Sequence, residues 1–137
     1  MTAPAFVIHS LEHAKAALAA AAEAGLPVTL VSAEGAAAYV GAMWFREMVA
    51  LAARDHPDLP VTAVLDCGDR PGDVLAALRH DLKTLSFSGR PAATKMLAAI
   101  AADYGAELVA RPRDALDLLD QPDPTAACRA WIGQKTP

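Results

Sequence analysis

Short apolar runs alternate with longer helix-like segments along most of this chain, and this alternation limits the possible folds more than any other feature. Five runs suit strands, spaced by roughly 25 residues. The expected strands cover residues 5–9, 28–31, 61–65, 84–87 and 107–110. Strands that alternate with helices predict a parallel sheet with right-handed crossovers.

The expected helices lie between these strands and after the last one. They cover residues 11–24, 36–54, 71–81, 91–104 and, as a short last helix, 113–119. Ser10 suits the N-cap of the first helix, and Gly25 followed by Pro27 suits its end. Residues 1–120 are therefore expected to form a single α/β domain and residues 121–137 a C-terminal tail. Trp131 and Ile132 would anchor that tail, on this chain or on a second copy.

Five strand–helix units cannot close an eight-stranded barrel, which needs at least about 200 residues. The sequence therefore favours an α/β fold with a five-stranded parallel sheet in a three-layer α/β/α sandwich, with flavodoxin-like strand order. A half TIM barrel is the alternative, because another chain could cover its unpaired edges.

Composition excludes several classes of function. The 137 residues are 54% hydrophobic and 20% charged, which argues against a disordered chain. The net charge of −4 gives no electrostatic case for binding nucleic acid or an anionic membrane. No apolar stretch approaches ~20 residues, and the first residues lack a basic segment typical of a signal peptide. A cytoplasmic location is therefore expected.

An acidic, thiol-bearing turn, at residues 66–69, follows the expected strand of apolar and β-branched residues at 61–65. Ligands of parallel α/β sheets bind at the carboxyl ends of strands, so Asp66 is the candidate catalytic acid/base. The alternative is that Asp66 caps the turn. Cys67 is a candidate metal ligand or reactive thiolate, or else a small buried residue.

Other strand ends carry candidate ligand-binding residues. The set is His9, Ser10, Ser32, Ser88 and Arg90. Ser88, Gly89 and Arg90 precede a helix N-terminus and would suit a small anion, although the same residues suit an ordinary turn. Arg111 also follows a strand end and would bring positive charge to the edge that carries Asp66.

Met43, Trp44 and Phe45 are consecutive large apolar residues that cannot all face one side of a helix. At least one of them is expected to face outward or into a partner. This feature, together with the tail, predicts a homo-oligomer, with a dimer as the expected state.

The chain resembles the first half of class II fructose-bisphosphate aldolases. The resemblance rests on residues 21–28 (AAEAGLPV), 32–39 (SAEGAAAY), 44–49 (WFREMV), 65–68 (LDCG) and 86–89 (SFSG). In that family the motif of the third strand reads His-Leu-Asp-His-Gly, with the Asp in proton transfer and the second His on zinc. Asp66 matches the Asp, whereas Cys67 replaces the zinc His and Val64 the first His.

The resemblance makes zinc a possible cofactor, with Cys67 as its one matching ligand position. After Gly89 the chain has neither a His nor a glycine cluster, so a full ligand set and the phosphate loops of the family are missing. The family's lyase activity is therefore not carried over unless a second subunit completes the site.

The order of polar residues is also similar to that of response-regulator receiver domains, with Asp66, Ser86 or Ser88, and Arg111-Pro112 at strand ends. His9-Ser10 replaces the acidic pair, so only the shape would be receiver-like. Two functions follow from the sequence. The first is a degenerate aldolase-like protein that binds a small anionic metabolite at the carboxyl edge of the sheet. The alternative is a non-catalytic, oligomeric interaction or regulatory module.

Overall fold

The computed structural model describes residues 3–135 and has a six-stranded parallel sheet with the strand order β5-β4-β3-β2-β1-β6. The α/β fold with a parallel sheet is therefore confirmed. The chain forms two compact units. The first unit comprises Met1–Val31, Met48–Thr62 and Pro112–Pro137, and the second comprises Ser32–Glu47 and Ala63–Arg111.

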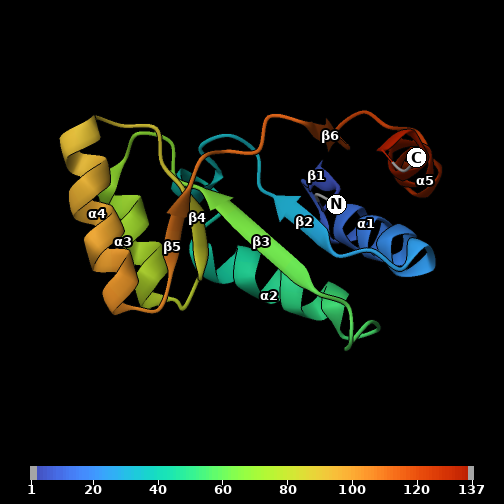
Figure 1. Ribbon diagram of the computed structural model, residues 1–137, viewed down its shortest axis with the longest axis horizontal. Helices are drawn as coiled ribbons and strands as arrows, with labels where there is room; N and C mark the ends of the chain where they lie inside the picture. The colour runs from blue at the N-terminus through green and yellow to red at the C-terminus, as the bar shows by residue number, and fades with distance from the viewer. Residues whose placement is uncertain (1–2, 136–137) are drawn as a thin grey trace. The chain divides into compact units, whose positions relative to one another are not determined.

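The first unit is built around β1 (Ala5–Val7), which lies between β2 (Val28–Val31) and β6 (Ala115–Asp117). Phe6 is fully buried and pairs with Leu30 on one side and Leu116 on the other. Helix α1 (Leu11–Ala24) packs against α5 (Pro124–Lys135), and the two helices can be followed in Figure 1. Ile132 is buried, so the predicted anchor of the tail packs on this chain.

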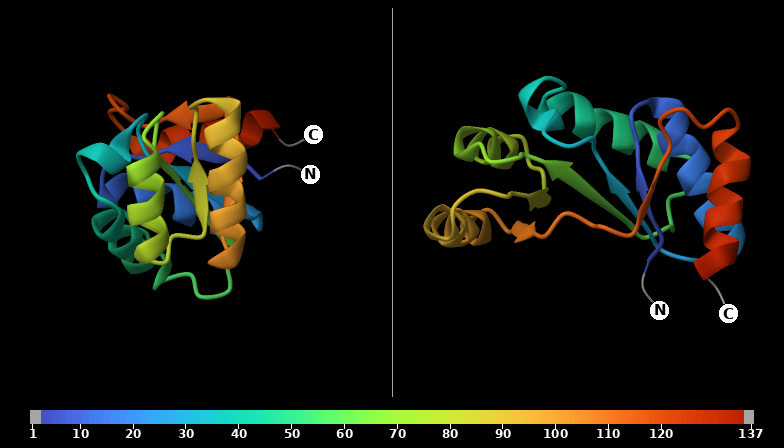
Figure 2. Two further views of the ribbon diagram at one scale, coloured as in Figure 1. Left: turned by 90° about the vertical axis from the view of Figure 1, so that its left-hand side faces the viewer. Right: turned by 90° about the horizontal axis from the view of Figure 1, so that it is seen from above.

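The second unit contains β4 (Thr84–Ser86), which lies between β3 (Val61–Asp66) and β5 (Glu107–Val109). Strand β3 begins in the first unit and ends in the second. Helices α3 (Pro71–Arg79) and α4 (Pro91–Asp103) lie side by side, as Figure 2 shows. The parallel register pairs Asp66 with Ser86, so the carboxyl ends of β3 and β4 lie side by side.

Local signals in the sequence set the ends of several elements correctly. Ser10 is extended and its hydroxyl accepts a hydrogen bond from the His13 N–H, which makes it the N-cap of α1. Gly25 ends the helix in the left-handed conformation, with φ of 69°. The predicted bounds of α1 and β2 are both confirmed.

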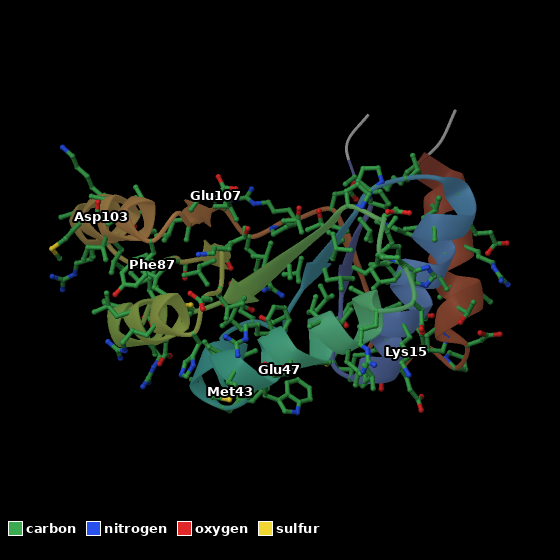
Figure 3. All side chains as sticks on the ribbon, turned by 90° about the horizontal axis from the view of Figure 1, so that it is seen from below. Lys15, Met43, Glu47, Phe87, Asp103 and Glu107 are labelled. Atoms are coloured by element: carbon green, nitrogen blue, oxygen red, sulfur yellow. The ribbon has the colours of Figure 1, made fainter. Side chains whose placement is uncertain are left out.

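The prediction of one helix over residues 36–54 is wrong. A short 3₁₀ helix, η1 (Ala36–Ala38), comes first, and α2 (Ala42–Ala53) follows. Gly41 lies between them with φ of 90°, which interrupts the helix. On α2, Phe45 is buried while Met43 and Trp44 are about half exposed, as expected for three consecutive apolar residues. Met43 and Glu47 both project from α2 in Figure 3.

The last predicted helix, over residues 113–119, is also wrong, because this segment contains β6. Its backbone pairs with β1, and the Leu118 N–H donates to the Val7 carbonyl at 3.0 Å. The free edge of β1 offers a row of hydrogen-bond partners that outweighs the weak helical preference of a short segment. The sheet therefore has six strands and not the predicted five.

The strand order corrects the preferred flavodoxin-like arrangement. From β1 to β5 each strand neighbours the next one in the sequence, whereas a flavodoxin-like sheet places β1 between β2 and β3. Consecutive order is that of the half-barrel alternative. Among residues 3–135, no helix combines the length and apolar character that crossing a membrane requires.

Candidate functional site

The candidate site is centred on the carboxylate of Asp66, at the carboxyl end of β3 in the second unit. Asp66 is 4% exposed. Its Oδ1 accepts hydrogen bonds from the backbone N–H groups of Gly35 at 2.7 Å and Gly68 at 3.0 Å. Both glycines have left-handed φ angles, 67° and 57°, which a larger residue adopts only with strain. One carboxylate oxygen therefore holds two loops.

The second oxygen of Asp66 faces two side chains from the next strands. The Ser86 hydroxyl, at the end of β4, donates to Oδ2 at 2.7 Å. Nη1 of Arg111, just beyond β5, lies 3.4 Å from the same oxygen, within ion-pair distance. That nitrogen is buried and has no hydrogen-bond acceptor among residues 3–135, so the pair is held by charge and not by an aligned hydrogen bond.

Ser32 connects the end of β2 to this cluster. Its hydroxyl accepts a hydrogen bond from the Asp66 N–H at 2.9 Å and donates to the Ala33 carbonyl at 3.1 Å. Ser32 is 3% exposed, so its hydroxyl is engaged within the protein. The structure thus brings together two sequence-predicted residues, Asp66 and Ser32, as direct partners.

The hydrogen-bonding capacity of the Asp66 carboxylate is almost filled. A carboxylate offers about four lone-pair positions. Three accept hydrogen bonds from Gly35, Gly68 and Ser86, and the Arg111 charge faces the fourth. This arrangement suits a carboxylate that positions loops. It leaves little room for a substrate proton, and the catalytic role of Asp66 stays a prediction.

Cys67, next to Asp66, is completely buried. Burial raises the pKa of its thiol to about 12, and the negative charges of Asp66 and Asp73 contribute in the same direction. The thiol lies 3.8 Å from the Leu65 carbonyl, to which it can donate. A protonated, buried thiol is unlike the exposed, low-pKa thiolates that act as nucleophiles.

Zinc, which the sequence resemblance implies, does not fit the residues present. Metal-bound cysteine is a thiolate, and catalytic zinc sites use three protein ligands. Within the described range 3–135, no group of three or more His, Cys, Asp and Glu side chains could share a metal ion. The role of Cys67 as a zinc ligand therefore stays a prediction, and residues 3–135 do not supply the other ligands that zinc would need.

Ser88 and Arg90 line an open pocket of about 550 Å³ in the second unit. Asp69, Pro71, Phe87, Gly89 and Ala93 complete its lining. The Ser88 N–H donates to the Gly68 carbonyl at 2.8 Å, which ties the pocket to the Asp66 turn. Arg90 is the N-cap of α4 but makes no side-chain cap hydrogen bond. The first N–H groups of α4 face the end of the helix without intrahelical partners.

The remaining predicted ligand-binding residues, His9 and Ser10, belong to the first unit. Nε2 of His9 lies 2.7 Å from Oδ1 of Asp117, and the His9 N–H donates to Nδ1 of His13. Burial and the nearby His9 lower the pKa of His13, opposed by the charges of Asp117 and Glu12. Because Ser10 caps α1 and His9 pairs with Asp117, both have structural partners.

Three partners of Asp66 were not among the predicted site residues: Gly35, Gly68 and Ser86. Of these, Ser86 had been named only in the comparison with receiver domains. A signal for Ser86 exists in the sequence, since it ends the strand after the one that Asp66 ends, and parallel strands align such residues. Gly35 lies 31 residues before Asp66, and nothing in the local pattern predicts that pairing.

Comparison with known proteins identifies the relatives of the chain. The sequence model of the family described as fructose-bisphosphate aldolase class-II matches residues 1–106. A plasmid-encoded fructose-bisphosphate aldolase of Cupriavidus necator is 36% identical over 86 residues, covering 63% of this chain and 25% of that protein. Fructose-bisphosphate aldolase 1 of Cereibacter sphaeroides is 31% identical over 112 residues, covering 82% of this chain and 30% of its own length.

The chain thus spans roughly a quarter to a third of the length of these relatives. A crystal structure from Coccidioides immitis, of a protein described as a candidate fructose-1,6-biphosphate aldolase, superposes with a TM-score of 0.66. The match covers 93% of this chain and 52% of that one at 19% identity, so it indicates a shared fold.

Proposed function

The chain belongs to the class II fructose-bisphosphate aldolase family, and we propose that it binds a small anionic metabolite at the carboxyl edge of the sheet without zinc-dependent catalysis by its own residues. One observation carries this proposal. The pocket lined by Ser88 and Arg90 presents a guanidinium that forms no ion pair or hydrogen bond with residues 3–135. An unpaired guanidinium beside a helix N-terminus favours phosphate or carboxylate groups.

The pocket also constrains the rest of the ligand. Asp69 lines it as well and would repel a molecule that is anionic on every side. A ligand with an anionic group near Arg90 and hydroxyl groups near Asp69 would satisfy both side chains. A sugar phosphate has this pattern, and fructose bisphosphate is named in the description of the relatives.

Asp66 supports the pocket indirectly in this proposal. Its carboxylate fixes Gly68, and the Gly68 carbonyl holds the Ser88 N–H. The sequence-based assignment of His9, Ser10 and Ser32 to the same ligand stays a prediction, as does the catalytic role of Asp66. Cys67 replaces the zinc histidine of the family's strand-three motif, and no histidine follows Gly89.

Isothermal titration with fructose 1,6-bisphosphate tests the proposal, with fructose as the uncharged control. We expect saturable binding of the bisphosphate only. Arg90→Gln should weaken binding about tenfold, because a charge-assisted contact is lost. The matched control is Arg79→Gln, an exposed arginine in the last turn of α3 and outside the pocket, which should bind normally. Absence of binding, or unchanged binding by Arg90→Gln, would contradict the proposal.

Gly89 offers an independent test of the same pocket. A Cβ built on Gly89 would lie 2.3 Å from Cζ of Phe87, another residue of the lining. Gly89→Ala should therefore displace the Phe87 ring and weaken binding while the circular dichroism spectrum stays normal. Gly72→Ala is the control, because a Cβ there meets no atom within 4 Å.

The oligomeric interaction module remains a second candidate, favoured by one specific observation. Tyr39, which follows η1, is 67% exposed, and Met43 and Trp44, at the start of α2, are 51% and 49% exposed. Sedimentation velocity tests this candidate. If these residues join two copies, Trp44→Ser should produce monomers, whereas Met96→Ser, at an exposed large apolar residue of α4, should not. A wild-type protein that is monomeric would reject the dimer.

A further inference from the structure

A second cavity lies in the first unit, at the amino ends of β1 and β6, and it has no part in the site around Asp66. Its volume is about 470 Å³, within the usual range of small-molecule sites. Ala3, Pro4, Ala5, Thr29 and Pro112 form one part of its lining, and Arg113, Asp114, Trp131 and Lys135 the other. The cavity therefore combines apolar walls with charged side chains.

Trp131 contributes a polar group that the described protein leaves unused. Its Nε1 is buried and has no hydrogen-bond acceptor among residues 3–135. The indole N–H can only donate, and buried donors in native proteins nearly always have an acceptor. An acceptor supplied from outside the described chain would complete this group.

The charges around the cavity indicate what that acceptor is. Nζ of Lys135 lies 2.7 Å from Oδ2 of Asp114, so the charge of this lysine is already neutralised by an ion pair. The same Nζ lies 4.4 Å from the centre of the Trp131 ring, where it makes a cation–π contact. Arg113 forms no side-chain ion pair or hydrogen bond with residues 3–135. Two cations and one carboxylate leave a formal charge of +1, which suits a single negative charge.

We propose that this cavity binds a small amphipathic monocarboxylate. Its carboxylate accepts the indole N–H of Trp131 and pairs with Arg113, whose planar guanidinium matches carboxylate geometry. Its apolar body lies against Pro4, Ala5 and Pro112. The site uses none of the residues proposed to bind the sugar phosphate, so either proposal can fail without the other.

The two tryptophans, Trp44 and Trp131, make the test direct, because each gives one indole N–H signal in a ¹H–¹⁵N correlation spectrum. Trp44→Phe assigns the two signals. Octanoate and 4-phenylbutyrate are the probes, one with an aliphatic and one with an aromatic body. We expect at least one to shift the Trp131 signal saturably at millimolar concentrations or below, while the Trp44 signal stays in place. 4-Phenylbutanol and 4-phenylbutylamine, which lack the carboxylate, should not saturate it.

Two variants distinguish binding through the proposed contacts from nonspecific binding of the probes. Arg113→Gln, an exposed position expected to fold normally, should weaken binding at least about fivefold. Arg129→Gln is the matched control, because this arginine lies on α5 and pairs with Glu23 outside the cavity. Failure of both probes to saturate, equal binding of the amine, or unchanged binding by Arg113→Gln would each overturn the proposal.

Discussion

The carboxylate of Asp66 and the indole N–H of Trp131 are buried polar groups in different units, and their surroundings differ in one decisive respect. The Asp66 carboxylate accepts three hydrogen bonds and faces an arginine. The Trp131 indole N–H has no acceptor among residues 3–135. A buried group with a full set of partners stabilises the fold, whereas one without partners favours a ligand that supplies them.

This difference changes the interpretation of Asp66. The sequence leaves two roles open, acid/base chemistry or capping of a turn. The contacts extend beyond a local cap, since Gly35 lies in the connection after β2 and Ser86 is the last residue of β4. Asp66 thus acts as a junction between loops, and its most direct consequence is the position of Ser88 in the neighbouring pocket.

The largest effect is expected from Asp66→Ala, which leaves two backbone N–H groups, a hydroxyl and Arg111 without their acceptor. We expect a loss of about 3–5 kcal/mol in the free energy of unfolding. Asp66→Asn keeps one acceptor oxygen and should lose about 1–3 kcal/mol. Urea denaturation measures both. Asp69→Ala, at an exposed neighbour, should change stability by no more than about 0.5 kcal/mol. Equal effects at residues 66 and 69 would reject the junction role.

Arg111→Met should have a smaller effect, because Asp66 keeps its three hydrogen bonds. The ion pair is partly buried, with the Arg111 side chain 28% exposed, so we expect a loss of about 1–2 kcal/mol. A double-mutant cycle with Asp66→Asn isolates the pair. A coupling energy near zero would mean that the 3.4 Å approach contributes nothing.

The two cysteines test the charge of Asp66 directly. The pKa of each is raised to about 12, for Cys128 by burial alone and for Cys67 by burial together with Asp66 and Asp73. Thiolate at pH 8 is then about one part in ten thousand, so alkylation by iodoacetamide should be slow at both. Asp66→Asn removes a negative charge and should lower the pKa of Cys67 only. The pH–rate profile of each cysteine, resolved by peptide mass spectrometry, measures this. Equal decreases in the pKa of Cys67 and Cys128 would indicate that the substitution destabilises the whole fold.

The smallest effect concerns His13 in the first unit. Its folded pKa is lowered, chiefly by burial, so the unfolded chain binds the proton first as pH falls. The stabilising contribution is full above the unfolded value of about 6.5 and decreases below it. Protonation would also remove the acceptor of the His9 N–H. Thermal melts between pH 7.5 and 5.5 should show a slope that His13→Asn reduces. A slope that is identical in the variant would contradict this.

The sequence determined the features that depend on neighbouring residues. Apolar runs and helix formers set the alternation of strands and helices, Ser10 and Gly25 set the ends of α1, and the family resemblance is confirmed. The position of Asp66 at a strand end followed from the same pattern. These features are encoded within a few residues, by side-chain periodicity and by the capping of backbone groups.

Tertiary structure alone decided the partners of distant segments. The periodicity of a strand does not say which strand lies beside it, so the sequence left the consecutive, half-barrel order as one of two alternatives and did not predict the pairing of β6 with β1. The hydrogen bond between the Gly35 N–H and Asp66 likewise depends on loops that meet only in the folded chain. Local chemistry selected the residue at the centre of the site, and long-range hydrogen bonding determined what that residue holds in place.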